Sequence, residues 1–193
     1  MFVALLDTCT LWPSLRRDFL LSMAVEGLYR PTWSEVILEE LEYCEAKKLV
    51  DRGTTAPDAE VQARHLIDQM RTHFAGALVT GWEPLEGTFG LPDPDDEHVV
   101  AAAVLASAGA IVTDNLKDFP TTNIPTGVEV LRPAQFAFNT VAVDPGLAAD
   151  AVREISRRSG RHGPALTPPQ ILTDLDTRYG MHDATALLRP HLH

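Results

Sequence analysis

The sequence predicts an α/β protein built around a parallel sheet. Short apolar runs of the kind that form buried strands occupy residues 2–6, 77–80, 110–113 and 128–131. Segments with helical periodicity lie between them, and this alternation is typical of strand–helix–strand units. The chain has 193 residues and is 45% hydrophobic, so it can form one domain with a buried core and a small appendage.

Three helical segments are predicted between the first and second strands. Residues 10–29 form the first of them. Thr32 and Glu35 match a capping box at the start of a second helix over 33–48, and a third helix is predicted over 58–75.

The start of the next helix is clearly marked. Asp93 is a favourable N-cap and Pro94 suits the first helical position. Gly109 suits the position just after a helix, so we expect the helix to run to that residue. The predicted strands 110–113 and 128–131 then complete the α/β pattern.

The last part of the chain lacks predicted strands. It contains three predicted helices, 146–158, 168–178 and 183–189. A Gly/Pro-rich connector at 159–169 separates the first two helices, and Thr167 with Gln170 forms a second capping box. We therefore predict a domain over residues 1–143 followed by a helical C-terminal extension over 144–193.

Charge is distributed unevenly along the chain. The net charge is −11, and residues 1–143 account for all of it with 10 basic and 21 acidic residues. Residues 144–193 are neutral, with six of each. A protein of this charge should not bind nucleic acid by bulk attraction, so binding would need metal ions or local basic patches.

Cysteine content and hydropathy favour a cytoplasmic protein without a membrane span. Cys9 and Cys44 are too few for a disulfide framework or a zinc site, and we expect buried free thiols. No run approaches the roughly 20 apolar residues of a membrane span. The start, MFVALLD, lacks the basic segment and the long apolar stretch of a signal peptide.

One glutamate of the predicted helix 33–48 does not fit a solvated face. At 100° per residue, Glu40 lies within the apolar arc formed by Val36 and Cys44. The other glutamates of the helix fall on the opposite, solvated side: Glu35, Glu39, Glu42 and Glu45. We therefore interpret Glu40 as a candidate functional residue.

Asp96 stands out in the same way on the helix that begins at Pro94. It occupies the first turn of an apolar stripe that continues through Val100 and Val104. Carboxylates in a first turn also favour the helix dipole, by about 0.3–1 kcal/mol, and this explains Asp95 and Glu97. It explains Asp96 less well, because its stripe must face the core.

Two further acids directly follow predicted strands. Asp7 follows the first and Asp114 follows the strand 110–113. Ligands of open α/β sheets bind at the carboxyl ends of the strands, so Asp7, Asp114, Glu40 and Asp96 should converge there. Anions about 5 Å apart repel by roughly 3 kcal/mol per pair at an effective dielectric near 20. Such a cluster indicates a bound cation, and oxygen ligands favour Mg²⁺ or Mn²⁺ over Zn²⁺.

Four sequence segments together resemble the motifs of PIN domains. They are LLDTCTL, SEVILEEL, PDPDDEHVVAAA and IVTDNLKDFP, and the resemblance covers roughly residues 1–140. The chain is most similar to VapC-type toxins that carry a helical C-terminal extension. The resemblance implies a three-layer α/β/α fold, Mg²⁺-dependent endonucleolytic cleavage of RNA such as tRNA or rRNA, and a cognate VapB-type antitoxin.

The resemblance also implies roles for individual residues. The acidic positions of the family correspond to Asp7, Glu40 and Asp96, and the fourth position is either Asp114 or Asn115. Further residues that would hydrogen-bond the carboxylates or a metal-bound water are Thr8, Thr10, Asp93, Thr113 and Asp118. Water activated by the metal would attack the phosphate in line and leave 5′-phosphate and 3′-OH ends.

Arginines are candidates for holding the RNA. Those near the first acid are Arg16, Arg17 and Arg30, and the densest cluster comprises Arg153, Arg157, Arg158 and Arg161. The alternative is a solvated helix face on which Asp150 and Glu154 pair with the arginines. His98 should point away from Asp96 and have a structural or surface role, because it lies about 200° from it around the helix.

Two other functions remain open. Asn115 permits a catalytically weakened PIN-like module that binds RNA or serves in an assembly. A phosphatase is less compatible with the sequence, because the DTCTL segment lacks a second strand-end aspartate two residues after Asp7.

By analogy with similar toxins, a homodimer is expected.

Overall fold

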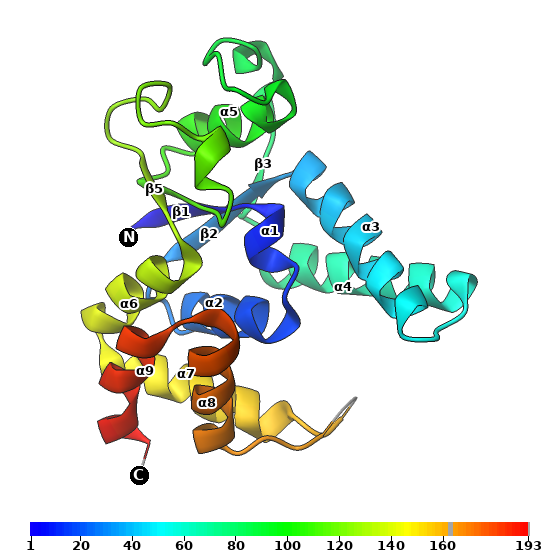
Figure 1. Ribbon diagram of the computed structural model, residues 1–193, viewed down its shortest axis with the longest axis vertical. Helices are drawn as coiled ribbons and strands as arrows, with labels where there is room; N and C mark the ends of the chain where they lie inside the picture. Colours follow the sequence, from blue (N-terminus) through cyan, green and yellow to red (C-terminus); the bar gives the residue numbers. More distant parts are fainter. Residues whose placement is uncertain (162–163, 193) are drawn as a thin grey trace. The chain divides into compact units, whose positions relative to one another are not determined.

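The computed structural model describes residues 1–161 and 164–192, which form two compact units (Figure 1). The first unit, here called the sheet unit, comprises Val3–Trp12 and Pro31–Val130. The second, here called the helical unit, comprises Met1–Phe2, Pro13–Arg30 and Leu131–His193. The chain therefore leaves the sheet unit after Trp12 and enters it again at Pro31.

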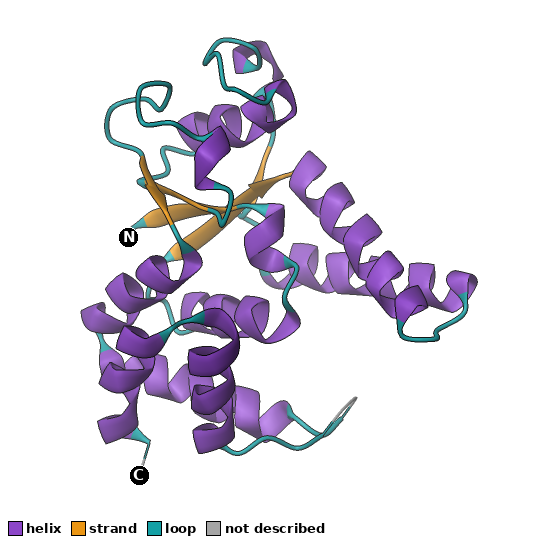
Figure 2. Cartoon of the chain, viewed as in Figure 1, coloured by secondary structure: helices purple, strands orange, loops and turns teal. Residues whose placement is uncertain are grey.

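A five-stranded parallel sheet lies at the centre of the sheet unit (Figure 2). Its strands are β1 (Val3–Leu6), β2 (Arg30–Ser34), β3 (Leu78–Val79), β4 (Ala110–Val112) and β5 (Glu129–Leu131). Their order is β3-β2-β1-β4-β5. β1 pairs with β4 with Ala4 opposite Ala110, and β2 pairs with β3 with Trp33 opposite Leu78. The inner strands β1 and β4 are almost wholly buried, as their apolar sequences predict.

Four of the five strands were predicted, and β2 was missed. Its sequence, RPTWS, contains a proline and polar residues, so it lacks an apolar run. The capping box predicted at Thr32 is wrong, because Thr32 lies within β2. Its hydroxyl donates a hydrogen bond to the carbonyl of Ala4 and does not cap the helix. Ser34 is the true N-cap, and its Oγ accepts a hydrogen bond from the backbone N–H of Ile37 at 3.2 Å.

Helices of the sheet unit connect these strands. They are α1 (Thr8–Leu11), α3 (Glu35–Asp51), α4 (Ala56–His73) and α5 (Glu97–Leu105). α3 and α4 form an antiparallel hairpin in which Leu38 and Leu41 are buried, as is Glu45, which pairs with Lys48. The prediction that Glu45 lies on a solvated face is therefore wrong.

The helix predicted from Pro94 to Gly109 is shorter than expected. A 3₁₀ turn, η2 (Pro94–Asp96), precedes α5, and α5 packs on β1 and β4. The helix ends at Leu105, because Ser107 adopts a left-handed φ of 52° before Gly109 is reached. Residues from Glu97 to Ala103 are buried on every side of α5, so this stretch has no solvated face.

Glu97 has a more specific role than a favourable charge at a helix start. It is 3% exposed, and its two carboxylate oxygens accept hydrogen bonds from the backbone N–H groups of Phe89 and Leu91 at 3.0 and 2.8 Å. Asn123 donates to the carbonyls of Phe89 and Gly90 in the same loop. The two side chains together hold the loop that leads to Asp93.

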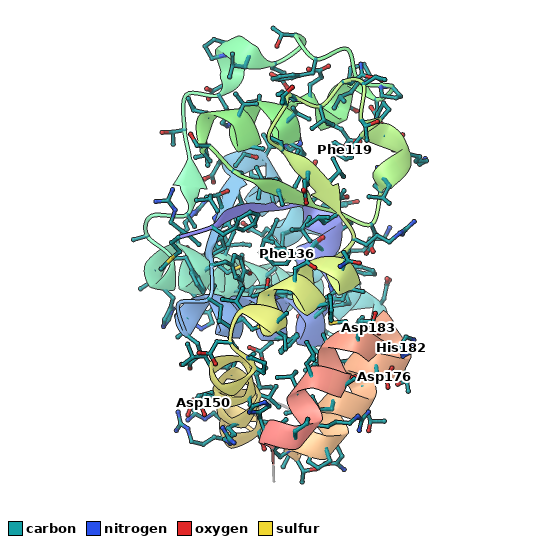
Figure 3. The ribbon with its side chains drawn as sticks, turned by 90° about the vertical axis from the view of Figure 1, so that its left-hand side faces the viewer. Phe119, Phe136, Asp150, Asp176, His182 and Asp183 are labelled. Carbon is teal, nitrogen blue, oxygen red and sulfur yellow. The ribbon has the colours of Figure 1, made fainter. Side chains whose placement is uncertain are left out.

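The helical unit consists of five α-helices among the described residues. They are α2 (Ser14–Val25), α6 (Pro133–Val143), α7 (Pro145–Arg158), α8 (Pro168–Tyr179) and α9 (His182–Leu188). α2 packs on α7 and α8, and α6 packs on α9. Asp176 on α8 pairs with His182 at the start of α9 (Figure 3). The three helices and the capping box predicted after residue 143 are confirmed.

The predicted border between residues 143 and 144 lies within the helical unit, because α2 and α6 pack with the later helices. The division into a domain over 1–143 and an extension over 144–193 stays a prediction. Residues 162 and 163 of the predicted connector, and His193, lie outside the described residues.

The predicted fold class is confirmed. A central parallel sheet with flanking helices, followed by a helical C-terminal part, is consistent with a three-layer α/β/α fold. None of the helices among the described residues is both long enough and apolar enough to span a membrane.

Candidate metal and active site

Acidic side chains meet where β1 and β4 end. The sheet continues from β1 to β2 on one side and to β4 on the other. This is a topological switch point, where α/β sheets form a crevice outside the carboxyl ends of their strands. Asp7 follows β1 and Thr113 follows β4, so the strand order brings these two residues together although 106 positions separate them.

Asp7 is oriented by hydrogen bonds on both of its carboxylate oxygens. Oδ1 accepts from the backbone N–H of Thr8 at 2.6 Å, and Oδ2 accepts from the hydroxyl of Thr113 at 2.6 Å. The carboxylate is 7% exposed. Because each oxygen can accept more than one bond, Asp7 keeps acceptor capacity for a cation while its direction is set by Thr8 and Thr113.

Cys9 also contacts Asp7, which sequence reasoning did not identify. Its Sγ donates to Asp7 Oδ2 at 3.0 Å and accepts from the backbone N–H of Asp114 at 3.2 Å. Burial, followed by the negative charge of Asp7, raises the pKa of the Cys9 thiol to about 11. The thiol is therefore a neutral donor at physiological pH. Cys9 and Cys44 keep their thiols and form no disulfide with each other, as expected, but each is half-buried and not fully buried.

Three carboxylates form a compact group next to Asp7. The group consists of Asp93 and Asp96 around η2, with Asp118 at the end of the turn η3 (Leu116–Asp118). One oxygen of each lies within 4.8 Å of the others. Phe119, labelled in Figure 3, is 2% exposed and anchors the chain directly after Asp118.

The charge state of Asp96 reflects this crowding. Burial is the main cause that raises its pKa, and the negative charges of Asp7, Asp93, Asp118 and Glu40 raise it further, to about 7. The amide Nδ2 of Asn115 donates to Asp96 Oδ2 at 3.4 Å. Such an accumulation of oxygens and negative charge is the environment in which a hard divalent cation is stable.

Glu40 enters the site from α3. Its Oε2 accepts a hydrogen bond from the hydroxyl of Thr8 at 2.5 Å. Its Oε1 lies 3.9 Å from Nε2 of His98. The side chain is 47% exposed, so Glu40 lies at the open side of the site, where substrate and water have access.

Comparison with known proteins gives one match. Residues 3–117 match the sequence profile described as the PIN domain. The chain belongs to the PIN domain family. PIN domains are generally nucleases that use divalent metal ions, and the carboxylate group is compatible with that activity. No curated protein and no solved structure matches the chain.

The structure distinguishes among the predicted residues of this PIN domain. Asp118, predicted only as an outer residue, joins Asp93 and Asp96 in the carboxylate group. Asp114 is exposed, and its backbone N–H donates a hydrogen bond to Sγ of Cys9. Asn115, the other candidate for the fourth position, contacts Asp96 directly. The geometry therefore favours Asn115 and Asp118 over Asp114.

His98, predicted to point away from Asp96 and to have a structural or surface role, is buried and contacts Ser34 and Glu40. The ring is 3% exposed, and its Nδ1 lies 3.2 Å from the hydroxyl of Ser34. Burial lowers the pKa of His98 despite the nearby negative charges. The angular argument assumed one continuous helix, whereas Asp96 belongs to a 3₁₀ turn and α5 starts only at Glu97. The periodicity of a single long helix does not apply across that junction.

The arginines predicted to hold RNA all lie in the helical unit of the PIN protein. Arg16 and Arg17 are 6% and 9% exposed, which weighs against contact with an external phosphate. Arg153 pairs with Asp150 and Arg157 pairs with Glu154, as the alternative interpretation anticipated. Arg158 bonds to Asp18 and Ser22 of α2.

Proposed function

We propose that this PIN domain is a Mg²⁺-dependent endoribonuclease that acts as the toxin of a VapBC-type toxin–antitoxin pair. The observation that carries the proposal is the group of carboxylates of Asp93, Asp96 and Asp118, within 4.8 Å of one another. The all-oxygen donor set suits Mg²⁺ or Mn²⁺. The cleavage of tRNA or rRNA, the VapB-type antitoxin and a homodimer rest on the resemblance of the motifs to VapC-type toxins.

The metal would be held by Asp7 and Asp96, with Asp93, Asp118 or Asn115 as a further ligand. When bound, the cation supplies positive charge to the phosphate oxygens and lowers the pKa of a water molecule. Thr8, Thr113 and Cys9 serve this chemistry indirectly. Their hydrogen bonds fix the direction of Asp7 before any ligand arrives, so little reorganisation is needed on binding.

Glu40 would act on the attacking water. It lies at the exposed side of the carboxylate group, and its position lets it accept a hydrogen bond from water and orient it towards phosphorus. In this reaction the water oxygen bonds to phosphorus and the 3′ oxygen leaves. The products are a 5′-phosphate and a 3′-OH, whereas attack by the ribose 2′-OH leaves a cyclic phosphate.

The cleavage of labelled RNA by the purified protein tests the nuclease. We expect cleavage in Mg²⁺, none in EDTA, and a loss of at least a hundredfold in Asp96→Asn, because that change removes a charged metal ligand. Asp95→Asn is the matched control, since Asp95 is an exposed neighbour, and it should retain activity. Full activity of Asp96→Asn in Mg²⁺, or cyclic phosphate ends, would contradict the proposed chemistry.

Growth of a bacterial host tests the toxin role separately. Expression of the wild-type chain should stop growth, while expression of Asp96→Asn should not. Co-expression with the product of a short neighbouring reading frame should restore growth. If the protein cleaves RNA in vitro but its expression leaves growth unchanged, the proposed toxin role is wrong, while the proposed nuclease activity is supported.

Asn115 supports a second candidate function. A neutral amide beside Asp96 contributes less negative charge than a carboxylate at that position, which would weaken the metal site. The chain would then be an RNA-binding or assembly module. Binding of RNA in Mg²⁺ without any cleavage, under the conditions of the assay above, would favour this alternative.

A further inference from the structure

His98 is a buried polar residue whose role the proposed reaction does not explain. It lies on α5, two residues after Asp96, and is 3% exposed. The indole ring of Trp82 packs against it, with 5.8 Å between ring centroids. Its two ring nitrogens face different elements: Nδ1 faces Ser34 at the end of β2, and Nε2 faces Glu40 on α3.

Ser34 has the chemistry to determine which ring nitrogen carries the proton. Its Oγ already accepts a hydrogen bond from the backbone N–H of Ile37, as the N-cap of α3. The hydroxyl proton is then available to Nδ1 of His98, 3.2 Å away. A neutral imidazole that accepts at Nδ1 must carry its proton on Nε2.

Glu40 favours the same tautomer from the other side of the ring. A carboxylate only accepts hydrogen bonds, so a proton on Nε2 is attracted to Oε1, whereas a lone pair there would be repelled. The distance of 3.9 Å is longer than a hydrogen bond. Contacts of this kind in ligand-free active sites often shorten when substrate binds.

Glu40 is therefore approached from two elements at once. Thr8 of α1 donates to Oε2, and His98 of α5 faces Oε1. A glutamate that is 47% exposed would otherwise sample several rotamers in water. The hydrogen bond from Thr8 and the approach of His98 both favour the conformation that Glu40 has in this structure.

We propose that His98 is a positioning residue for Glu40, and that Ser34 holds the ring in the Nε2–H form that this role requires. This inference rests on the proposed nuclease function of the same site. His98 itself touches neither metal nor substrate in this scheme. It acts through the direction and the conformational freedom of the Glu40 carboxylate.

The tautomer of His98 can be measured without metal or RNA. Long-range ¹H–¹⁵N correlation spectra at pH 8 distinguish Nε2–H from Nδ1–H, and the His98 signals are those lost in His98→Gln. We expect Nε2–H in the wild type and a mixture of both forms in Ser34→Ala. An Nδ1–H ring in the wild type would overturn the proposal. This result stands whether or not the chain cleaves RNA.

A double-mutant cycle on RNA cleavage tests the action through Glu40. We expect His98→Leu to lower kcat at least tenfold with little change in KM, and His98→Gln, which keeps a donor near Glu40, to restore much of it. In a Glu40→Gln background, His98→Leu should lower kcat less than twofold, because the group that it positions is gone.

Equal losses of kcat in the two backgrounds would show that His98 is merely structural and would overturn the proposal. If the wild type cleaves no RNA at all, the proposed nuclease function is wrong. The tautomer measurement still tests whether Ser34 and Glu40 hold His98 in the Nε2–H form.

Discussion

At the scale of single residues, Asp96 is the group whose chemistry is most altered by its surroundings. Its pKa is raised to about 7, first by burial and then by four neighbouring negative charges. In a protein without bound metal, the folded state therefore holds a proton on Asp96 that the unfolded chain has released, between a pH of 3.8 and about 7. A divalent cation replaces that proton and lets the carboxylate ionise, which couples metal affinity to pH.

This shift predicts a pH dependence of stability in EDTA. Because the pKa is higher in the folded state than the unfolded value of 3.8, the contribution of Asp96 to stability is fully present below that value. It is lost as pH rises towards about 7. In Asp96→Asn this contribution is absent, so its melting temperature should decline less over the same range. Thermal denaturation from pH 4 to 8 measures the difference, and parallel curves for the two proteins would contradict it.

The sequence predicted that Asp7, Glu40 and Asp96 approach one another, and the negative charges of Asp7 and Glu40 both act on Asp96. Their roles in a reaction stay predictions, and Glu40 is 47% exposed although the sequence placed it within an apolar arc. Strand ends are local features that the sequence reveals, whereas helical periodicity placed Glu45 on a solvated face although it is buried. The approach of Asp118 depends on how a loop folds after β4, which periodicity does not describe. The burial of Arg16 and Arg17 likewise depends on helices that lie far away in the sequence.

At the scale of elements, α5 organises much of the site. The turn before it carries Asp96, its first residue Glu97 holds the preceding loop, and its second residue is His98. The sequence predicted a helix in this place but not its junction with a 3₁₀ turn. β2 was missed because a short strand with a proline has no apolar run, although it supplies the N-cap of α3.

The hydrogen bonds of Glu97 predict a large loss of stability on its removal. Glu97→Ala leaves the N–H groups of Phe89 and Leu91 without their acceptor, and an unsatisfied buried donor costs about 1–3 kcal/mol. We expect the free energy of unfolding in urea to fall by at least about 2 kcal/mol. Glu97→Gln, which keeps one acceptor oxygen, should lose less.

Glu86→Ala is the matched control for this measurement, because Glu86 lies near the same loop and is exposed. Its effect should stay within about 0.5 kcal/mol. An equally small effect of Glu97→Ala would mean that the loop is held by other contacts, such as those of Asn123.

At the scale of the whole molecule, net charge would govern encounters with the proposed RNA substrate. The chain carries a net charge of −11, and the arginines Arg153, Arg157 and Arg158 are each matched by an acidic partner. General attraction to phosphates is therefore weak, and a bound cation becomes the main positive charge that the site can offer.

The binding of RNA should consequently depend on divalent cations. With fluorescent RNA in 150 mM salt, we expect no binding in EDTA at micromolar protein, and saturable binding after the addition of Ca²⁺, which slows cleavage. Arg157→Ala should bind like the wild type, because Arg157 is already paired with Glu154. Tight binding in EDTA with a steep salt dependence would show instead that a basic surface holds the RNA.

The chain passes from the sheet unit to the helical unit after Trp12 and returns at Pro31. This path affects how the protein can be shortened for laboratory work. A fragment trimmed to residues 3–117 would retain α2 but lose α7 and α8, against which that helix packs. Phe19, Leu20 and Met23 of α2 are fully buried in the intact chain, and loss of the helices that pack on α2 would expose apolar surface, which favours aggregation. A shortened sheet unit would need residues 13–29 replaced by a short polar linker, so that β2 keeps Arg30, and β5 retained up to Leu131.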